Sequence, residues 1–474
     1  MKSYLSSSSV CCWVPCHHLP RSSGFHTSLF WRANYMLRAN MNVRKPHRFV
    51  IRVECIASNL HSKMRRLLTV MDRSLDRGWN RHQKAAVIWI TISCLILSPG
   101  FQFDILQGTF NDNSALAAKN RFAPGTNEPV VKDPEVILRN ALPIENKTIR
   151  KVQHTLELIP KDIRTRSWSK IEQEFKQAKS LLEKQKDDIL VSVPESKRTK
   201  AQAILDDLIS NKMPSLKQVI SEKDSERIIA TNTDVLRDIG VLEEDMVKQF
   251  PYEIPSEYDY LPQLKGRAVV ELTIKKANNQ KFDLDGQLFE QGHLTLVIDG
   301  YSAPVTGGCF VDLVNRGFYD GMKVIRSDGF VIQTGDPEGP DDGYVDPRTK
   351  KKRLVPLEVF AKGDEAPTYG ITLEDDGRGA AATVLPFTSY GTLAMAREEF
   401  DANSASSQFF WLLFDPELTP AGRNLLDGRY AVFGYTVGGQ EYLQDFKVGD
   451  YIQQAKVIKG LENLKQPLDT STAE

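Results

Sequence analysis

Cysteine and histidine are scarce over most of this chain of 474 residues. Of its six cysteines and eight histidines, only Cys309, His154 and His293 lie beyond residue 117. A disulfide framework in that longer part is therefore excluded, and so is a histidine-rich metal site. That part also lacks a GxGxxG string, a Walker loop, an HExxH motif and a CxxC pair, so the enzyme classes that depend on them are not indicated. We interpret Cys309 as a small core residue and expect no metal and no cofactor.

Acidic residues are missing from the first 53 positions, which hold eight lysines and arginines. Residues 1–117 carry 15 basic and 5 acidic residues, a formal charge of +10. The remaining 357 residues carry 46 basic and 56 acidic residues, a formal charge of −10. An acidic body of this size argues against nucleic acid as a partner.

The basic, serine-rich N-terminus is typical of an organelle import segment. A later apolar run, Ala85 to Leu97, covers 13 positions, fewer than the roughly 20 that span a bilayer as a helix. Together with the small residues at 115–117, this run predicts a cleaved secretory-type signal. We therefore interpret residues 1–117 as a bipartite plastid and thylakoid targeting sequence. The mature protein would begin near Ala118, lie in the chloroplast thylakoid lumen and have no stable membrane span; the alternative is an uncleaved single-span anchor.

After a flexible tail at residues 118–132, residues 133–248 predict an all-α bundle of four or five helices. Asp133 followed by Pro134 is typical of a helix start, and Ser167 is a second candidate cap. Apolar residues then recur at helical spacing, and we interpret these stripes as the bundle core; the alternative is a zipper that pairs with a partner. Four prolines are expected to divide the helices: Pro143, Pro160, Pro194 and Pro214.

Residues 249–266 are rich in proline and predict an extended linker. Its tyrosines, Tyr252, Tyr258 and Tyr260, are expected to dock on a domain surface. From Arg267 onward the apolar period falls to two, which is typical of strands. With one helix predicted near 304–316, residues 267–460 indicate a mainly-β closed barrel. We expect the basic run at 350–353 to be a solvated loop and residues 461–474 to be disordered.

Five strings in the β region occur in a fixed order: GFYDG from Gly317, GFVIQTGD from Gly329, GTLAMA from Gly391, SSQFF from Ser406 and LDGRYAVFG from Leu426. Together they resemble the cyclophilin family. The resemblance implies a C-terminal cyclophilin barrel with peptidyl-prolyl cis-trans isomerase activity. The layout as a whole resembles the multidomain cyclophilins of the thylakoid lumen, in which the helical bundle is PsbQ-like. The expected fold is therefore a multidomain one, an N-terminal all-α helical bundle followed by a C-terminal mainly-β closed barrel.

The resemblance also implies a site. Rotation about an X–Pro bond is opposed by amide resonance, with a barrier of about 20 kcal/mol, and a donor placed for the twisted amide lowers it. Arg326 falls at the family's arginine if one residue is deleted between it and Gly329, and Gln333 falls where a glutamine orients that arginine. The positions that match the family's substrate-binding positions are Phe330, Val331, Ala396, Arg397, Gln408, Phe410, Leu425, Leu426 and Tyr430.

Several of these positions depart from the family pattern. Val331 replaces a methionine, Arg397 an asparagine, Tyr430 the pocket histidine, and Leu425 a tryptophan found in many members. Three functions therefore stay open. The protein is an isomerase acting on proline-containing loops of photosystem II proteins, a non-catalytic assembly chaperone, or a regulatory partner of a thylakoid membrane phosphatase. We expect a monomer.

Overall fold

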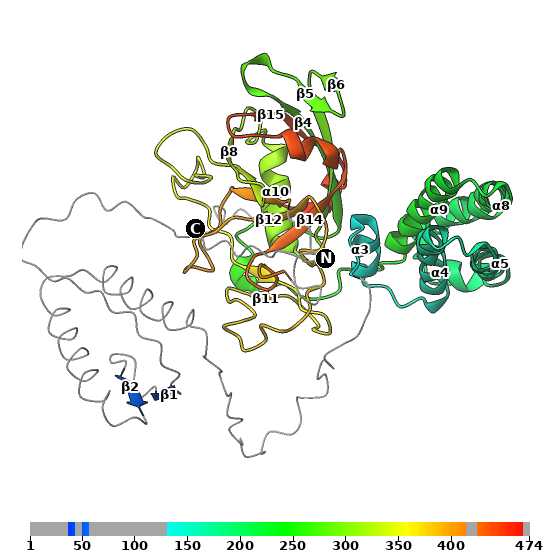
Figure 1. The fold of residues 1–474 in the computed structure, drawn as a ribbon, viewed down its shortest axis with the longest axis horizontal. Helices are drawn as coiled ribbons and strands as arrows, with labels where there is room; N and C mark the ends of the chain where they lie inside the picture. Colours follow the sequence, from blue (N-terminus) through cyan, green and yellow to red (C-terminus); the bar gives the residue numbers. More distant parts are fainter. Residues whose placement is uncertain (1–36, 43–49, 56–129, 414–423, 468–474) are drawn as a thin grey trace, which may run out of the picture. The chain divides into compact units, whose positions relative to one another are not determined.

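The computed structural model describes residues 130–413 and 424–467, together with two short N-terminal strands (Figure 1). The chain forms two compact units, residues 1–123 and 124–474. In the first, β1 (Leu37–Asn42) pairs antiparallel with β2 (Val50–Cys55). The apolar run at 85–97 and the cleavage site at 115–117 lie outside the described residues, so the predicted processing stays a prediction.

The second unit begins with helices, as predicted. Their bounds are α3 Pro134–Ala141, α4 Lys147–Arg164, α5 Trp168–Lys184, α6 Lys186–Val191, α7 Glu195–Asp207, α8 Met213–Glu222 and α9 Ser225–Asp245. Asp133 caps α3, because its side chain accepts hydrogen bonds from the N–H groups of Glu135 and Val136. The apolar stripes are buried together in one cluster, with Ile149 and Leu156 fully inaccessible, which supports their interpretation as a bundle core.

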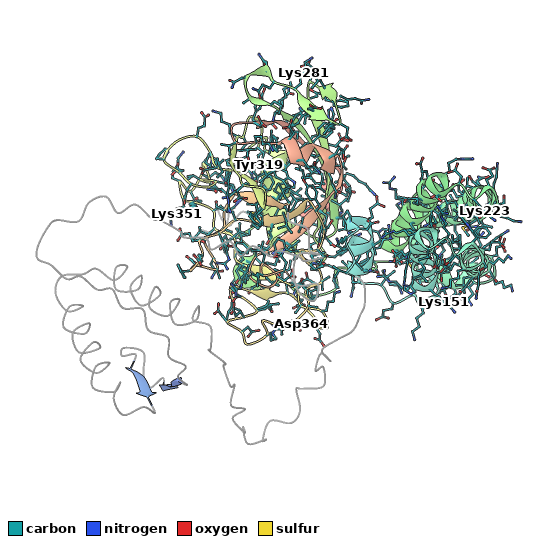
Figure 2. All side chains as sticks on the ribbon, in the orientation of Figure 1. Lys151, Lys223, Lys281, Tyr319, Lys351 and Asp364 are labelled. Atoms are coloured by element: carbon teal, nitrogen blue, oxygen red, sulfur yellow. The ribbon has the colours of Figure 1, made fainter. Side chains whose placement is uncertain are left out.

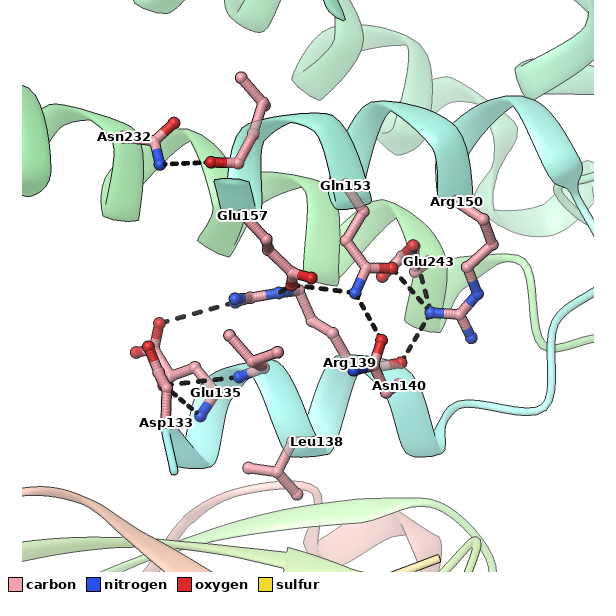
Figure 3. Close-up of polar contacts among 12 residues, drawn as sticks. Asp133, Glu135, Leu138, Arg139, Asn140, Arg150, Gln153, Glu157, Asn232 and Glu243 are labelled. Carbon is pink, nitrogen blue, oxygen red and sulfur yellow. Dashed lines mark hydrogen bonds and ion pairs between the residues drawn. The ribbon is translucent and has the colours of Figure 1, made fainter. Parts of the chain in front are cut away.

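Two of the expected helix boundaries are wrong. Pro160 lies inside α4, and Pro214 lies in the first turn of α8, which continues from α7 through a π-helical turn at Leu208–Lys212. Pro160 lacks the N–H group that would bond to the carbonyl of Leu156. The buried side chain of Asn232 on α9 donates a hydrogen bond to that carbonyl at 3.0 Å instead (Figure 3). Ser167 precedes α5 but makes no capping hydrogen bond through its side chain.

Helix α3 does not belong to the bundle core. Ile137 and Leu138 are buried in a cluster with residues of the sheet domain such as Phe387 and Tyr435. The opposite side of the helix contacts the bundle through Arg139, whose Nε donates to Glu157 on α4 at 3.0 Å (Figure 3). Its apolar residues thus stabilise the sheet region, while its arginine anchors it to α4.

The rest of the unit is a sheet domain built around one buried helix, α10 (Pro304–Asn315). Eight strands form an antiparallel sheet in the order β15-β4-β7-β14-β12-β13-β9-β8. Their bounds are β4 Arg267–Lys275, β7 Gly292–Asp299, β8 Val324–Ser327, β9 Val331–Thr334, β12 Thr392–Met395, β13 Phe409–Leu412, β14 Val432–Gly438 and β15 Tyr451–Lys459. Short pairs lie beside this sheet: β3 Gln263–Leu264 with β16 Leu464–Lys465, β5 Phe282–Leu284 with β6 Gln287–Phe289, and β10 Glu358–Val359 with β11 Thr368–Tyr369.

The expectation of a closed barrel is corrected, because the sheet is open. β8 and β15 are its two outer strands. A single bridge, Lys323 to Tyr451, and a few backbone hydrogen bonds connect their adjoining ends, rather than a continuous ladder.

The interior of the sheet domain is aromatic. Tyr319 lies inside it, whereas Lys281 and Lys351 lie on its outside (Figure 2). The Tyr319 ring lies 5.2 Å from that of Phe310 on α10 and 5.3 Å from that of Phe409 on β13. Cys309 is fully buried here, which supports its interpretation as a core residue, and burial raises its pKa to about 12.

Three smaller expectations are partly wrong. Two linker tyrosines dock, since the Tyr252 hydroxyl donates to the carbonyl of Tyr301 at 2.9 Å and Tyr258 packs on Tyr369, but Tyr260 stays 63 % exposed. In the basic run, the Arg353 guanidinium is buried against Asp312 at 2.6 Å, so that end of the run is not solvated.

The chain also stays ordered beyond residue 460. β16 pairs with β3, and the Asn463 side chain donates to the Arg267 carbonyl at 2.8 Å. The disorder expected from residue 461 is therefore wrong as far as residue 467, and residues 468–474 lie outside the described part. Within that part, no helix combines the length and the apolarity needed to cross a membrane, and no group of three or more histidines, cysteines or carboxylates is placed to hold a metal ion.

Candidate active site

A pocket of about 520 Å³ opens on the sheet domain between β8, β9, β13 and the segment before β14. Its lining consists of Arg326, Phe330, Val331, Gln333, Ala396, Arg397, Phe410, Leu412, Asn424, Leu425, Leu426 and Tyr430. These residues span more than a hundred positions of the chain. The antiparallel pairing of β13 with both β9 and β12 is what brings them together.

The floor of the pocket is apolar and closely packed. Phe410 is only 6 % exposed; its ring is stacked on Phe387 at 6.1 Å and meets Tyr430 edge-on at 5.6 Å. Phe330 and Leu425 stand at the rim with exposed fractions of 58 % and 81 %. This floor would desolvate a small apolar ring such as that of proline. The rim offers apolar surface to the residues that flank the proline in a bound peptide.

Arg326 supplies the cationic group of the pocket. It lies on β8 directly opposite Gln333 on β9, next to an irregularity in the register that follows Val324. Its guanidinium bonds to the carboxylate of Asp328, with Nε at 2.7 Å and Nη2 at 2.5 Å from the same oxygen. Partial burial acts to raise the pKa of Asp328, but hydrogen bonds from Val331 N–H and Arg326 outweigh it and hold that pKa below its usual value.

Gln333 does not orient the arginine as the resemblance implies. Its side-chain amide donates to Gln408 at 2.8 Å, and over the described residues no hydrogen bond joins it to Arg326. Gln408 in turn donates to Asp336 at 3.0 Å and to the carbonyl of Asp342 at 2.9 Å. The two glutamines thus form a polar chain behind the pocket, and Gln408 lies outside its lining.

Arg397 and Tyr430, two departures from the family pattern, form a pair. The Arg397 guanidinium lies 4.9 Å from the centre of the Tyr430 ring, within the range of a cation–π contact. It also donates to the carbonyls of Arg429 at 2.9 Å, Glu398 at 2.7 Å and Glu399 at 3.0 Å. The pair fixes one wall of the pocket and makes it cationic.

Ten of the eleven predicted site residues therefore line one pocket, and Gln408 supports it from behind. Sequence reasoning missed Leu412, Asn424 and Asp328. The period of two along β13 could have found Leu412, because it places that residue on the same face as Phe410. Asn424 accepts a hydrogen bond from Leu426 N–H, and neither this contact nor the Arg326–Asp328 pair had a signal in the five strings.

Comparison with known proteins agrees with this geometry. Residues 283–463 match the family model of the cyclophilin type peptidyl-prolyl cis-trans isomerases, and residues 133–247 match the PsbQ-like domain of the CYP38-like isomerases. The chain is 46 % identical over 342 residues to the chloroplastic peptidyl-prolyl cis-trans isomerase CYP38 of Arabidopsis thaliana, covering 72 % of this chain and 76 % of that protein.

The chain belongs to the cyclophilin family.

Two further relatives bear on its place in the cell. This cyclophilin is 47 % identical over 335 residues to a protein of Synechocystis named as a thylakoid lumen peptidyl-prolyl cis-trans isomerase, covering 70 % of this chain and 84 % of that one. It is 32 % identical to the chloroplastic isomerase CYP37 of Arabidopsis thaliana over 363 residues, covering 74 % of each chain. The predicted localisation to the chloroplast thylakoid lumen is confirmed by the CYP38 and Synechocystis relatives, as is the predicted pairing of a PsbQ-like helical domain with a cyclophilin domain.

Proposed function

We propose that this cyclophilin is a peptidyl-prolyl cis-trans isomerase that acts on proline-containing loops of photosystem II proteins during their assembly in the thylakoid lumen. The observation that carries the proposal is the pocket itself, an apolar floor around Phe410 with the Arg326 guanidinium at its edge. The names of the relatives support the same activity and compartment.

The chemistry follows from these parts. The Phe410 floor holds the prolyl ring, while the preceding residue rotates about the C–N bond. As the amide loses conjugation, its nitrogen gains a lone pair that can accept a hydrogen bond. A guanidinium is always charged and donates in a fixed geometry, so Arg326 stabilises the twisted amide more than either planar isomer, which is the condition for lowering the barrier.

The test is turnover of a defined X–Pro peptide by the mature protein. Arg326→Ala should reduce isomerisation roughly 100-fold, the scale of a lost transition-state donor, and should leave the unfolding temperature unchanged because the side chain is half exposed. Arg164→Ala, an exposed arginine at the end of α4, is the matched control and should keep full turnover. Equal turnover in wild type and Arg326→Ala would contradict the proposal.

A second function, a non-catalytic assembly chaperone, is favoured by one observation. The rim residues Phe330 and Leu425 are exposed apolar side chains, while Arg326 is engaged with Asp328. Such a pocket can bind a proline loop without turning it over. Capture of partners from thylakoids with wild type and with Phe410→Ala, which alters the pocket floor, separates the functions. Retention of photosystem II proteins by a wild type that shows no isomerase turnover would support the chaperone. Capture of a membrane phosphatase would support the regulatory alternative.

A further inference from the structure

The turn between β8 and β9 places a carboxylate against the arginine of the pocket. Asp328 uses its two oxygens for different purposes. Oδ1 accepts hydrogen bonds from the backbone N–H groups of Phe330 and Val331, both at 3.0 Å. Oδ2 accepts a hydrogen bond from Nε of Arg326 at 2.7 Å and lies 2.5 Å from Nη2 in an ion pair. The backbone therefore holds the carboxylate in place, and the carboxylate holds the guanidinium.

The geometry of the turn gives this pair its persistence. Asp328 lies only two residues after Arg326, and Gly329 follows with a positive φ of 83°, which lets the chain reverse tightly towards Phe330. Because Oδ1 is fixed by two N–H groups, Asp328 cannot follow the guanidinium towards a ligand. Nε donates to the carboxylate and Nη2 lies in an ion pair with it, so this edge of the guanidinium can donate to a prolyl nitrogen only if it leaves or shares that partner.

We propose that Asp328 is a positioning residue that withholds the Arg326 guanidinium from the prolyl nitrogen and so restrains isomerisation by this chain. The inference rests on the proposed isomerase function and names a restraint within the same site. It predicts that the enzyme is slow because its donor is already engaged, although the pocket itself is intact. Removing the charge of Asp328 while keeping the turn should therefore speed up catalysis.

Asp328→Asn makes this separation, because the amide oxygen can still accept from the N–H groups of Phe330 and Val331 while the amide nitrogen cannot accept from Arg326. We expect kcat to rise roughly two- to fivefold, in line with the strength of an exposed ion pair, with KM unchanged because the restraint acts on the donor and not on the pocket floor. Asp328→Ser, whose hydroxyl also accepts in such turns, is a second variant should the first fail to fold.

The matched control is Asp376→Asn. Asp376 forms the same kind of local pair, with Arg378 Nε at 2.6 Å, and its exposed fraction of 38 % is close to the 37 % of Asp328. It lies outside the pocket lining, so its substitution should leave kcat unchanged. The dependence of kcat on ionic strength is a second measurement, and a purely structural role of Asp328 would not change it. Added salt screens an exposed ion pair, so kcat should rise with ionic strength more in wild type than in Asp328→Asn.

The outcomes separate this inference from the function on which it rests. A higher kcat in Asp328→Asn than in wild type supports the restraint, whether or not wild type itself shows turnover. Adding Arg326→Ala to Asp328→Asn should then abolish the gain. An active wild type with an equal or slower Asp328→Asn overturns the restraint and leaves the isomerase standing. No turnover in wild type, Asp328→Asn and Asp328→Ser alike overturns both.

Discussion

Glu243 in the helical bundle and Glu358 in the sheet domain are equally buried, with 0 % and 1 % exposure, but their carboxylates have different partners. Glu358 accepts from the N–H groups of Val305 and Thr306, at 3.1 Å and 2.7 Å. It thus caps α10, whose own N-cap, Ala303, has no side-chain acceptor. Glu243 has one ion pair, 3.4 Å from Arg150 Nη1, and its second oxygen has no hydrogen-bond partner among the described residues (Figure 3).

Burial alone does not determine what a charge does for the fold. In the sheet domain the buried carboxylate satisfies two orphan donors of a helix N-terminus, which is a structural need. In the bundle it is incompletely paired, so desolvation raises the pKa of Glu243 to about 7 against the opposing effect of Arg150. Burial raises the pKa of Glu358 too, against the lowering effect of its hydrogen bonds with Thr306 and Val305. What separates the two carboxylates is therefore the number of their hydrogen-bond partners: the first should stabilise the fold through the helix cap, whereas the second mainly makes stability depend on pH.

The largest effect is expected at Glu358. Glu358→Ala leaves the N–H groups of Val305 and Thr306 buried without acceptors, and each lost partner costs about 1–3 kcal/mol. We expect a loss of about 3 kcal/mol or more in the free energy of unfolding, measured by denaturant titration. Glu365→Ala, at an exposed position, is the control, and a loss as small as in this control would show that the cap is not needed.

A smaller effect is expected where the bundle accommodates Pro160. Asn232→Ala removes the donor to the Leu156 carbonyl and should cost about 1–2 kcal/mol. Pro160→Ala restores the backbone N–H for that carbonyl, so the two substitutions should not be additive. A double-mutant cycle by thermal unfolding tests this coupling: in the Pro160→Ala background, the cost of Asn232→Ala should shrink, and an unchanged cost would contradict the compensation.

At pH 7 the smallest effect is expected from the titration of Glu243. Its folded-state pKa of about 7 lies above the ordinary value of about 4.3 in an unfolded chain. The folded state therefore binds more protons between those values, and this group's contribution to stability falls as pH rises from about 4.3 through 7. Glu243→Gln should flatten the stability profile between pH 5 and 8 by about 2–3 kcal/mol.

The charged groups around Glu243 are Arg150, Arg139, Glu157 and Arg267. Glu174 is the internal comparison, because burial and a hydrogen bond with Asp162 also raise its pKa to about 7. Glu174→Gln should remove a separate part of the decrease in the free energy of unfolding with rising pH. Superimposable pH profiles for wild type and Glu243→Gln would show that the carboxylate is not titrating in this range.

The two regions also differ in what the sequence could predict. The bundle stripes were predictable because a period near 3.6 directly sets which residues face the core. Pro160 misled the helix boundaries because the Leu156 carbonyl that it leaves without a backbone donor is bonded by Asn232, 76 positions after Leu156, and no local sequence pattern predicts that contact. In the sheet domain, the resemblance carried by the ordered strings predicted nearly the whole pocket lining. Whether the sheet closes depends on whether β8 pairs with β15, and the alternation of apolar and polar residues along a strand does not specify its partner.

The state of the pocket arginine was the main feature that the sequence left out. The resemblance implied that Gln333 orients Arg326, but Gln333 bonds to Gln408 instead. Arg326 lies opposite Gln333 in the β8–β9 pairing, but its guanidinium lies against Asp328, two residues further along the chain. The residue types are visible in a sequence, but the partner that a long side chain selects is not.

Whether this pocket binds and isomerises X–Pro peptides is tested by one NMR titration of the isotope-labelled mature protein with a short X–Pro peptide. The titration reports where the peptide binds and whether it is isomerised. We expect shifted amides in β9, β13 and residues 424–430, together with cis–trans exchange peaks of the peptide at catalytic amounts of protein. Arg326→Ala should remove the exchange peaks without moving the binding site. Shifts confined to other surfaces, with no exchange peaks, would contradict this expectation.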